Sequence, residues 1–272
     1  MMILAALLAQ AAGLGATNYT VDLPMVAPDR RPSVADEFDK RTIDRSIWRF
    51  DTARNAQGWS NHELQYYAAA RLSNARIEHD MLVIEARRET LDGKRFADWS
   101  GQRYSSARLV SRKAFEYGFY EIRAKLPCAR GTWPAIWMLP SSGTWPDQGE
   151  IDVMEMVGWD PNVVHATLHT GAFNHAQGTQ RGAALRVPSA CTAFHRYQLD
   201  WQPHAILVGV DGRAYLRVRD DQPGGHAAWP FTRPFQIILN LAIGGDWGGK
   251  QGVDDAALPQ RMTVDYVRYW KN

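Results

Sequence analysis

The stretch Phe235–Ile243 reads FQIILNLAI and places a large apolar side chain at every second position. Successive side chains of a β-strand point to opposite faces, so this period of two indicates a strand with one face in a core. The same period runs through Phe115–Leu126, where Glu121, Arg123 and Lys125 alternate with apolar residues. Both stretches are therefore predicted to be strands that are buried on at least one side.

The rest of the chain repeats this pattern. No segment carries an apolar period of 3.6 residues long enough for a substantial helix, and turns rich in Gly, Pro and Asp separate the short alternating runs. Further strands are predicted at Asp80–Arg88, Tyr104–Ser111, Val163–Thr170, Phe194–Trp201, Ala205–Val210, Ala214–Val218 and Met262–Trp270. Many short strands joined by such turns predict an all-β sandwich or barrel.

Length and composition narrow the class of protein further. The 272 residues suffice for one large domain, and 31 basic against 29 acidic residues give a formal net charge of only +2. So small a charge provides no field that would attract nucleic acid or an acidic membrane. The 11 tryptophans exceed what a core of this size needs, which favours an uncharged, ring-stacking partner such as carbohydrate.

The chain begins with an apolar, small-residue stretch, MMILAALLAQAAGLGA. It is too short to span a bilayer, and we expect an export signal over residues 1–17 and a secreted or periplasmic protein. A disordered apolar tail is the alternative. Residues 18–33 are predicted to form a linker, because residues 27–33 contain two prolines and three charges. The remaining residues, 34–272, are then expected to form one folded domain.

The chain has two cysteines, Cys128 and Cys191. An exported chain passes through an oxidising compartment, where two thiols form a disulfide if their Cβ atoms come close enough. Two unrelated buried thiols remain the alternative at this stage.

The segment Gly149–Met156, GEIDVMEM, places three acids among apolar residues typical of a buried strand. In a regular strand Glu150 and Asp152 share a face, whereas Glu155 points to the opposite side. One extra residue at Val153 or Met154 would form a β-bulge and shift the phase. The sequence therefore predicts a bulge that turns all three carboxyl groups to one face.

Such a cluster suits hydrolysis of a glycosidic bond. Backbones about 13 Å apart, with side chains that lean toward each other, would place two carboxyl groups about 5 Å apart, the separation in retaining glycosidases. Crowding raises at least one pKa, so one group can donate a proton while its ionised partner attacks. The alternative is a solvated acidic edge that only prevents strand aggregation.

The segment GEIDVMEMVG at residues 149–158 resembles the active-site strand of glycoside hydrolase family 16, in its bulged, laminarinase-like branch. Other blocks that resemble bacterial members of this branch follow in the same order, at Trp59–Tyr67, Tyr104–Arg108, Lys125–Pro127, Trp133–Met138, His165–His169 and Leu239–Gly245. Together they cover about residues 34–271.

This resemblance implies a β-jelly roll of two curved antiparallel sheets with the substrate cleft on the concave sheet. It makes Glu150 the nucleophile, Asp152 its helper and Glu155 the general acid/base of a retaining endo-1,3-β-glucanase. An agarase-like or mixed-linkage β-glucanase of the same family is an alternative activity. A non-catalytic β-glucan-binding domain is a third possibility, because a fold does not fix a function.

The resemblance also implies residues that contact sugar. Asn61 and Arg108 match family positions that contact hydroxyl groups. Trp133 and Trp137 lie four residues apart in extended chain and share a face, where their rings could stack on sugars or pack in the core. His169 is expected to bind substrate or the acid cluster.

Many members of the family bind calcium on the convex face, and Glu37 and Asp265 match that pattern. The alternative for these two acids is a surface salt bridge each. The chemistry itself is expected to need no cofactor, and the protein is expected to be a monomer. At Cys128 the chain departs from its commoner relatives, which often carry a charged residue there.

Overall fold

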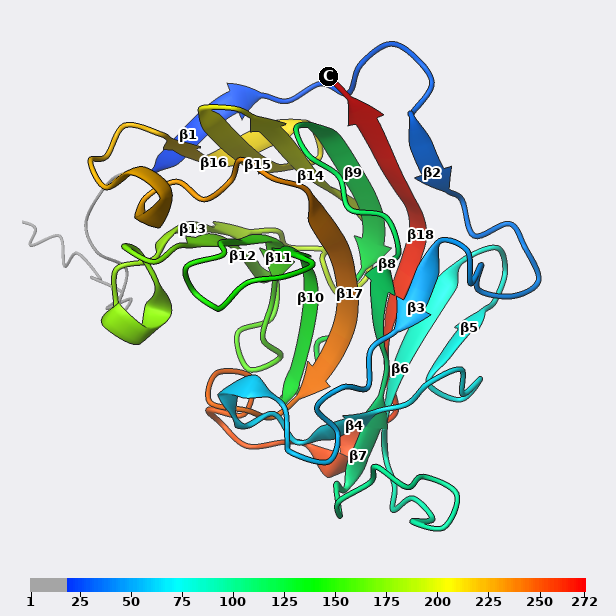
Figure 1. Cartoon of the computed structure of the whole chain (residues 1–272). Coiled ribbons are helices and arrows are strands. Elements are labelled where there is room, and N and C mark those ends of the chain that lie inside the picture. The colour runs from blue at the N-terminus through cyan, green and yellow to red at the C-terminus, as the bar shows by residue number, and fades with distance from the viewer. Residues whose placement is uncertain (1–18) are drawn as a thin grey trace, which may run out of the picture.

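The computed structural model describes residues 19–272, which form two β-sheets packed face to face (Figure 1). The export signal expected over residues 1–17 lies outside these residues. The larger sheet contains β1 (Thr20–Pro24), β2 (Val34–Asp36), β4 (Gln65–Tyr67), β5 (Ala75–Ile77), β6 (Leu82–Arg88), β7 (Tyr104–Ser106), β9 (Gly118–Lys125), β14 (His195–Gln202), β15 (Ala205–Val210), β16 (Arg213–Arg219) and β18 (Gln260–Lys271). The smaller sheet contains β3 (Trp48–Phe50), β8 (Arg108–Ser111), β10 (Thr132–Pro140), β11 (Glu150–Glu155), β12 (Val163–His169), β13 (Arg181–Arg186) and β17 (Phe235–Ile243).

The helical content is limited to four short 3₁₀ turns in the part of the chain that the structure describes. They are η1 (Ser60–His62), η2 (His175–Gln177), η3 (Gly225–Ala227) and η4 (Asp255–Ala257). No helix within residues 19–272 is both long and apolar enough to cross a membrane.

The smaller sheet has the strand order β13-β12-β11-β10-β17-β8-β3, and all of its pairs are antiparallel. The larger sheet follows the path β1-β16-β15-β14-β9-β18-β6-β7-β4, with β4 and β7 as a parallel pair. Both sheets curve in the same direction, and the smaller sheet lies inside the curve of the larger one (Figure 1). The predicted jelly-roll sandwich is confirmed.

The apolar faces of the two sheets meet in one core. In β9 the alternation predicted from sequence is present, with Tyr120, Ile122 and Ala124 at most 1% exposed. Glu121 lies on the other face but is also buried, at 4% exposure. Its carboxylate accepts a hydrogen bond from the Tyr266 hydroxyl. A buried carboxylate requires such a partner.

The stretch Tyr104–Ser111 was predicted to be one strand, and this prediction is wrong. It forms two strands, β7 in the larger sheet and β8 in the smaller, and fully buried Ala107 lies between them. A period of two shows that a chain is extended, but it carries no information on which sheet provides the hydrogen-bond partners.

The linker prediction for residues 18–33 is wrong for its first part. Residues 20–24 form β1, which pairs with β16 at the edge of the larger sheet, and Met25 is only 3% exposed. Further along, the backbone oxygen of Arg30 accepts a hydrogen bond of 2.7 Å from the Trp270 indole. Edge pairing depends on a distant strand, which the prolines and charges of this short segment do not reveal.

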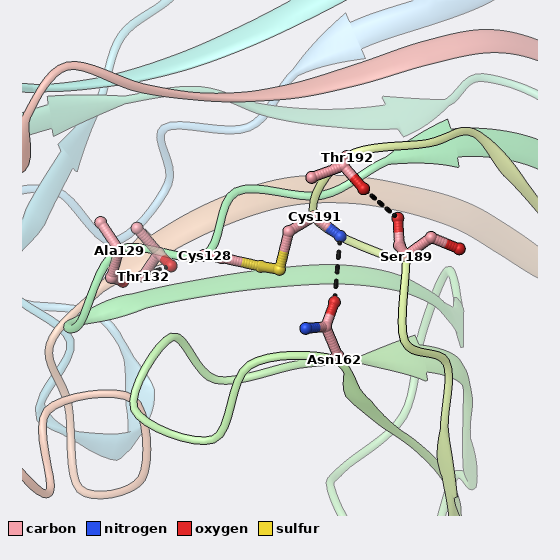
Figure 2. The surroundings of a disulfide bond; sticks show 7 residues. All are labelled: Cys128, Ala129, Thr132, Asn162, Ser189, Cys191 and Thr192. Atoms are coloured by element: carbon pink, nitrogen blue, oxygen red, sulfur yellow. Dashed lines mark hydrogen bonds between the residues drawn. A yellow bond between two sulfur atoms is a disulfide. The ribbon is translucent and has the colours of Figure 1, made fainter.

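Cys128 and Cys191 form a disulfide with Cα atoms 5.7 Å apart (Figure 2). The bond joins the segment after β9 to the turn before β14, across 63 positions of sequence. The turn is also held by the Cys191 amide, which donates a hydrogen bond of 3.3 Å to the Asn162 side chain. The disulfide therefore joins two connections through which the chain passes between the sheets, β9–β10 and β13–β14.

Replacing both cysteines with alanine is expected to lower the free energy of unfolding by about 4 kcal/mol, because the bond closes a long loop in the unfolded chain. Urea unfolding of the double variant and of the wild type measures this difference. As a control, thiol titration of the denatured, unreduced wild-type protein should detect no thiol. An unchanged unfolding midpoint would show that the bond does not constrain the unfolded chain.

Candidate active site

The strand β11 contains the predicted bulge. Between Asp152 and Glu155 its register shifts, so that Val153 and Met154 together stand opposite the single residue Ala166 of β12. The pairing with β10 shifts at the same place. This extra residue reverses the alternation and returns the last acid to the face of the first two. The prediction of a bulge at this position is confirmed.

Two tryptophan indoles hold the outer acids of the strand. The Trp145 Nε1 atom donates a hydrogen bond of 2.6 Å to Glu150, and Trp133 Nε1 donates one of 2.9 Å to Glu155. All four side chains line the same cleft. Each N–H group orients its carboxyl group and favours the ionised form of that group.

Asp152 lies between these two acids and is 2% exposed. Burial, with a smaller contribution from the charge of Glu155, raises its pKa. One of its oxygens lies 3.3 Å from Nε2 of His169, which is 6% exposed. His169 thus contacts the acid cluster, and it does not belong to the lining of the cleft. The reason is that the rings of Trp145 and His175 pack over it, at centroid distances of 6.0 and 5.0 Å.

The pKa values of the outer acids lie far above the usual range for carboxyl groups. Burial, followed by the charge of Asp152, raises the pKa of Glu150 to about 8. Burial, followed by the charge of Glu150, raises the pKa of Glu155 to about 7. The cluster therefore retains a proton near neutral pH, and because both values are raised, they do not by themselves assign the roles of the two groups.

The cleft runs over the face of the smaller sheet that is turned away from the larger sheet, and it has a volume of about 530 Å³. Its walls carry four indole rings, those of Trp59, Trp133, Trp137 and Trp145. Aromatic faces of this kind can stack on the apolar faces of sugar rings. Asn61 also lines the cleft, from η1, with a left-handed φ of 57°.

Arg108 reaches the cleft from the start of β8. Its guanidinium lies between two indole rings, 5.1 Å from the centroid of Trp59 and 4.7 Å from that of Trp137. Its Nε atom is 3.0 Å from a carboxylate oxygen of Asp51. The Trp137 indole donates a hydrogen bond of 2.6 Å to Asn240. Arg108 and Trp137 are thus held rigidly in the cleft, where the sequence predicted them.

Several residues that line the cleft were not predicted as site residues, among them Glu63, Trp145 and His175. Glu63 belongs to the block Trp59–Tyr67, which resembles a block of the family, but no pattern at its own position predicted a role in the site. Trp145 lies in the loop before β11 and His175 begins the 3₁₀ turn η2 after β12, and their ring centroids are 4.8 Å apart. Loop residues have no periodicity, so only the folded chain shows that these side chains meet.

The two acids expected to bind calcium do not form a joint site. Arg268 binds Glu37 through two hydrogen bonds of 2.8 Å, and Arg123 binds Asp265. Nowhere in residues 19–272 do three or more His, Cys, Asp or Glu side chains gather as metal ligands would. Each acid is neutralised by a guanidinium, so this donor set does not fit a calcium ion.

Residues 62–268 match the model of the glycosyl hydrolases family 16. The chain is 48% identical over 249 residues to a beta-glucanase of Rhodothermus marinus, covering 87% of this chain and 84% of the relative. Its structure superposes on SCLam, a non-specific endo-beta-1,3(4)-glucanase, with a TM-score of 0.90 at 49% identity, covering 97% and 98% of the two chains. The laminarinase of Rhodothermus marinus gives a TM-score of 0.82 at 47% identity, covering 89% and 97%. The chain therefore belongs to family 16 of the glycosyl hydrolases.

Proposed function

We propose that the protein hydrolyses internal 1,3-β-glucosidic bonds of β-glucans with retention of configuration. The observation that supports this most directly is the bulged strand, which presents Glu150 and Glu155 to one cleft, each with an indole donor. The order of the acids in the family motif makes Glu150 the nucleophile and Glu155 the acid/base.

The reaction proceeds in two displacements. Protonated Glu155 donates its proton to the glycosidic oxygen while the Glu150 carboxylate attacks the anomeric carbon, which breaks the glycosidic bond and forms a glycosyl ester. Glu155, now ionised, takes a proton from water as that water attacks the ester carbon and releases Glu150. The raised pKa of Glu155, about 7, suits a group that must donate and then accept a proton near neutral pH.

Asp152 is proposed to act through Glu150. It is buried beside that acid, and His169 lies 3.3 Å from its second oxygen. A proton held by Asp152 would lower the local negative charge and allow Glu150 to ionise. His169 is proposed to position Asp152 rather than to bind sugar.

The substrate class follows from the cleft and from the relatives. Four indole rings and few cations suit an uncharged polymer of β-linked glucose. Among the similar proteins, one is a glucan endo-1,3-beta-glucosidase and another is a non-specific endo-beta-1,3(4)-glucanase. Product analysis after incubation with laminarin, lichenan and agarose tests the proposal. We expect oligosaccharides of several lengths from laminarin. Cleavage of agarose alone, or binding of laminarin without cleavage, would support the alternatives instead.

The proposed reaction uses carboxyl groups alone and needs no organic cofactor. We further propose that the protein acts outside the cytoplasm as a monomer. The location outside the cytoplasm is supported by the apolar stretch at residues 1–16 and by the disulfide, since disulfides persist mainly in oxidising compartments.

The dependence of kcat/KM on pH is expected to be bell-shaped. Below the optimum the nucleophile becomes protonated. Above it the acid loses its proton. Because burial raises the pKa values of Glu150 and Glu155 to about 8 and 7, the form of the pair that holds one proton is most abundant between pH 7 and 8, so the rate should be highest there and fall above about pH 8. Initial rates on laminarin in buffers of constant ionic strength measure this profile. A rate that stays constant up to pH 9 would contradict a carboxylic acid as the proton donor.

A further inference from the structure

Glu63 is a carboxyl group in the cleft that the proposed reaction does not use. It precedes β4 and lines the cleft together with Glu150 and Glu155. Its Oε2 atom accepts hydrogen bonds from Gln65 at 2.8 Å and from the Tyr67 hydroxyl at 3.4 Å. Among the described residues, no hydrogen bond involves its Oε1 atom. One oxygen of this carboxyl group is therefore held by the protein, and the other is free to bind a ligand.

The groups that hold Glu63 are themselves buried and fixed. Gln65 and Tyr67 are fully buried, and the Gln65 side-chain oxygen accepts a hydrogen bond of 2.8 Å from the Ile243 amide. The Tyr67 hydroxyl accepts one of 2.9 Å from Asn240, which also holds the ring of Trp137. This chain of hydrogen bonds links Glu63 to the ring of Trp137 in the wall of the cleft. A side chain held so rigidly presents its free oxygen in one direction.

Within residues 19–272 no basic side chain forms a salt bridge with Glu63. Arg108 is near enough for its charge to lower the pKa of Glu63, yet Asp51 already lies 3.0 Å from its Nε atom. Burial acts in the opposite direction and is the larger cause, so the pKa of Glu63 is raised overall. A partly desolvated carboxyl group with an unused oxygen is satisfied best by a donor from outside the protein.

We propose that Glu63 is a specificity-determining residue that accepts a hydrogen bond from a sugar hydroxyl, while Arg108 donates to a neighbouring sugar oxygen. Such a pair of one acceptor and one donor matches two adjacent hydroxyl groups of a glucosyl unit. This inference rests on the proposed function, and it adds the selection of uncharged sugars at this site.

The charges of the cleft support selection against anionic sugars. The acidic side chains that line it are Asp51, Glu63, Glu150 and Glu155, and the basic ones are Arg54 and Arg108. Asp51 neutralises Arg108, so Glu63 adds negative charge that Arg108 does not balance. A sulfate ester beside this carboxyl group would be repelled, whereas a hydroxyl group would be bound.

Glu63→Gln tests the proposal because it keeps the shape and an oxygen for Gln65 and Tyr67. We expect KM for laminarin oligosaccharides to rise about tenfold, as for loss of a charge-assisted hydrogen bond, with kcat within about twofold of the wild type. Sulfated laminarin, added as a competitor, should inhibit the variant more strongly than the wild type. Glu78→Gln is the matched control, since Glu78 pairs with Arg76 outside the cleft, and its KM should not change.

A second readout separates a role in binding from a structural one. The charge of Glu63 contributes to the raised pKa of Glu155, so Glu63→Gln should move the alkaline limb of kcat/KM to lower pH. Glu63→Asp, which withdraws the carboxyl group, serves if the first variant does not fold, and should also raise KM. If the wild type cleaves laminarin and these variants have the same KM as the wild type, this inference is wrong and the proposed function is unaffected. Failure of the wild type to cleave any β-1,3-glucan would overturn the proposed function with it.

Discussion

Replacing Glu150 with glutamine is expected to lower kcat on laminarin by about 10⁴-fold, because no carboxylate remains to attack the anomeric carbon. The fold should persist, since glutamine keeps the volume of glutamate and can still accept the hydrogen bond from Trp145. Reducing-sugar release under saturating substrate measures the loss. The thermal unfolding midpoint of the same preparation shows that the fold is intact.

A smaller variant identifies the nucleophile directly. In Glu150→Ala, azide can occupy the space of the lost carboxylate and attack from the same side, so the product should be an α-glycosyl azide, with inverted configuration. Proton nuclear magnetic resonance distinguishes the two anomers. A near wild-type rate without azide would show that Glu150 is not the nucleophile.

Replacing Glu155 with alanine is expected to lower kcat/KM on laminarin by about 10³-fold or more, because a glycosidic oxygen leaves slowly without a proton. An aryl glycoside with a good leaving group needs no such proton, so the first step on this substrate should be far less affected. Azide should then release a β-glycosyl azide, with the configuration retained. Comparing the two substrates measures the contribution of the acid.

The control for this experiment is Glu155→Gln, which keeps the hydrogen bond from Trp133. It should lose the alkaline limb of the pH profile along with most of the rate on laminarin. Equal losses on laminarin and on the activated aryl glycoside would argue that Glu155 positions substrate and does not donate the proton.

The bulge could be predicted from the sequence because it depends only on whether the acids are an odd or an even number of residues apart along one strand. Glu155 lies an odd number of residues from Asp152, so a shared face requires one extra residue, and the structure has it at Val153 and Met154. The apolar alternation in β9 and β17 likewise predicted the core. These features are local, and they are set by the period of the strand itself.

Features that depend on distant partners could not be predicted in this way. The strand Thr20–Pro24 is defined by its pairing with β16, and the change of sheet at Ala107 is defined by the neighbours on each side. Trp145 reaches Glu150 through a loop, and Glu63 depends on hydrogen bonds to Asn240 by way of Tyr67. No periodic pattern encodes contacts of these kinds.

The position of β1 bears on where the chain can be shortened. It covers the outer edge of β16, and the Met25 amide extends the contact by donating a hydrogen bond of 2.7 Å to Gly212. A recombinant version that starts at residue 34 would leave the amide and carbonyl groups on the outer edge of β16 without partners, while the other edge would stay paired with β15. Exposed edges of this kind recruit strands from other molecules. The safe starting point for expression therefore lies before Thr20, in front of the segment that protects the sheet from self-association.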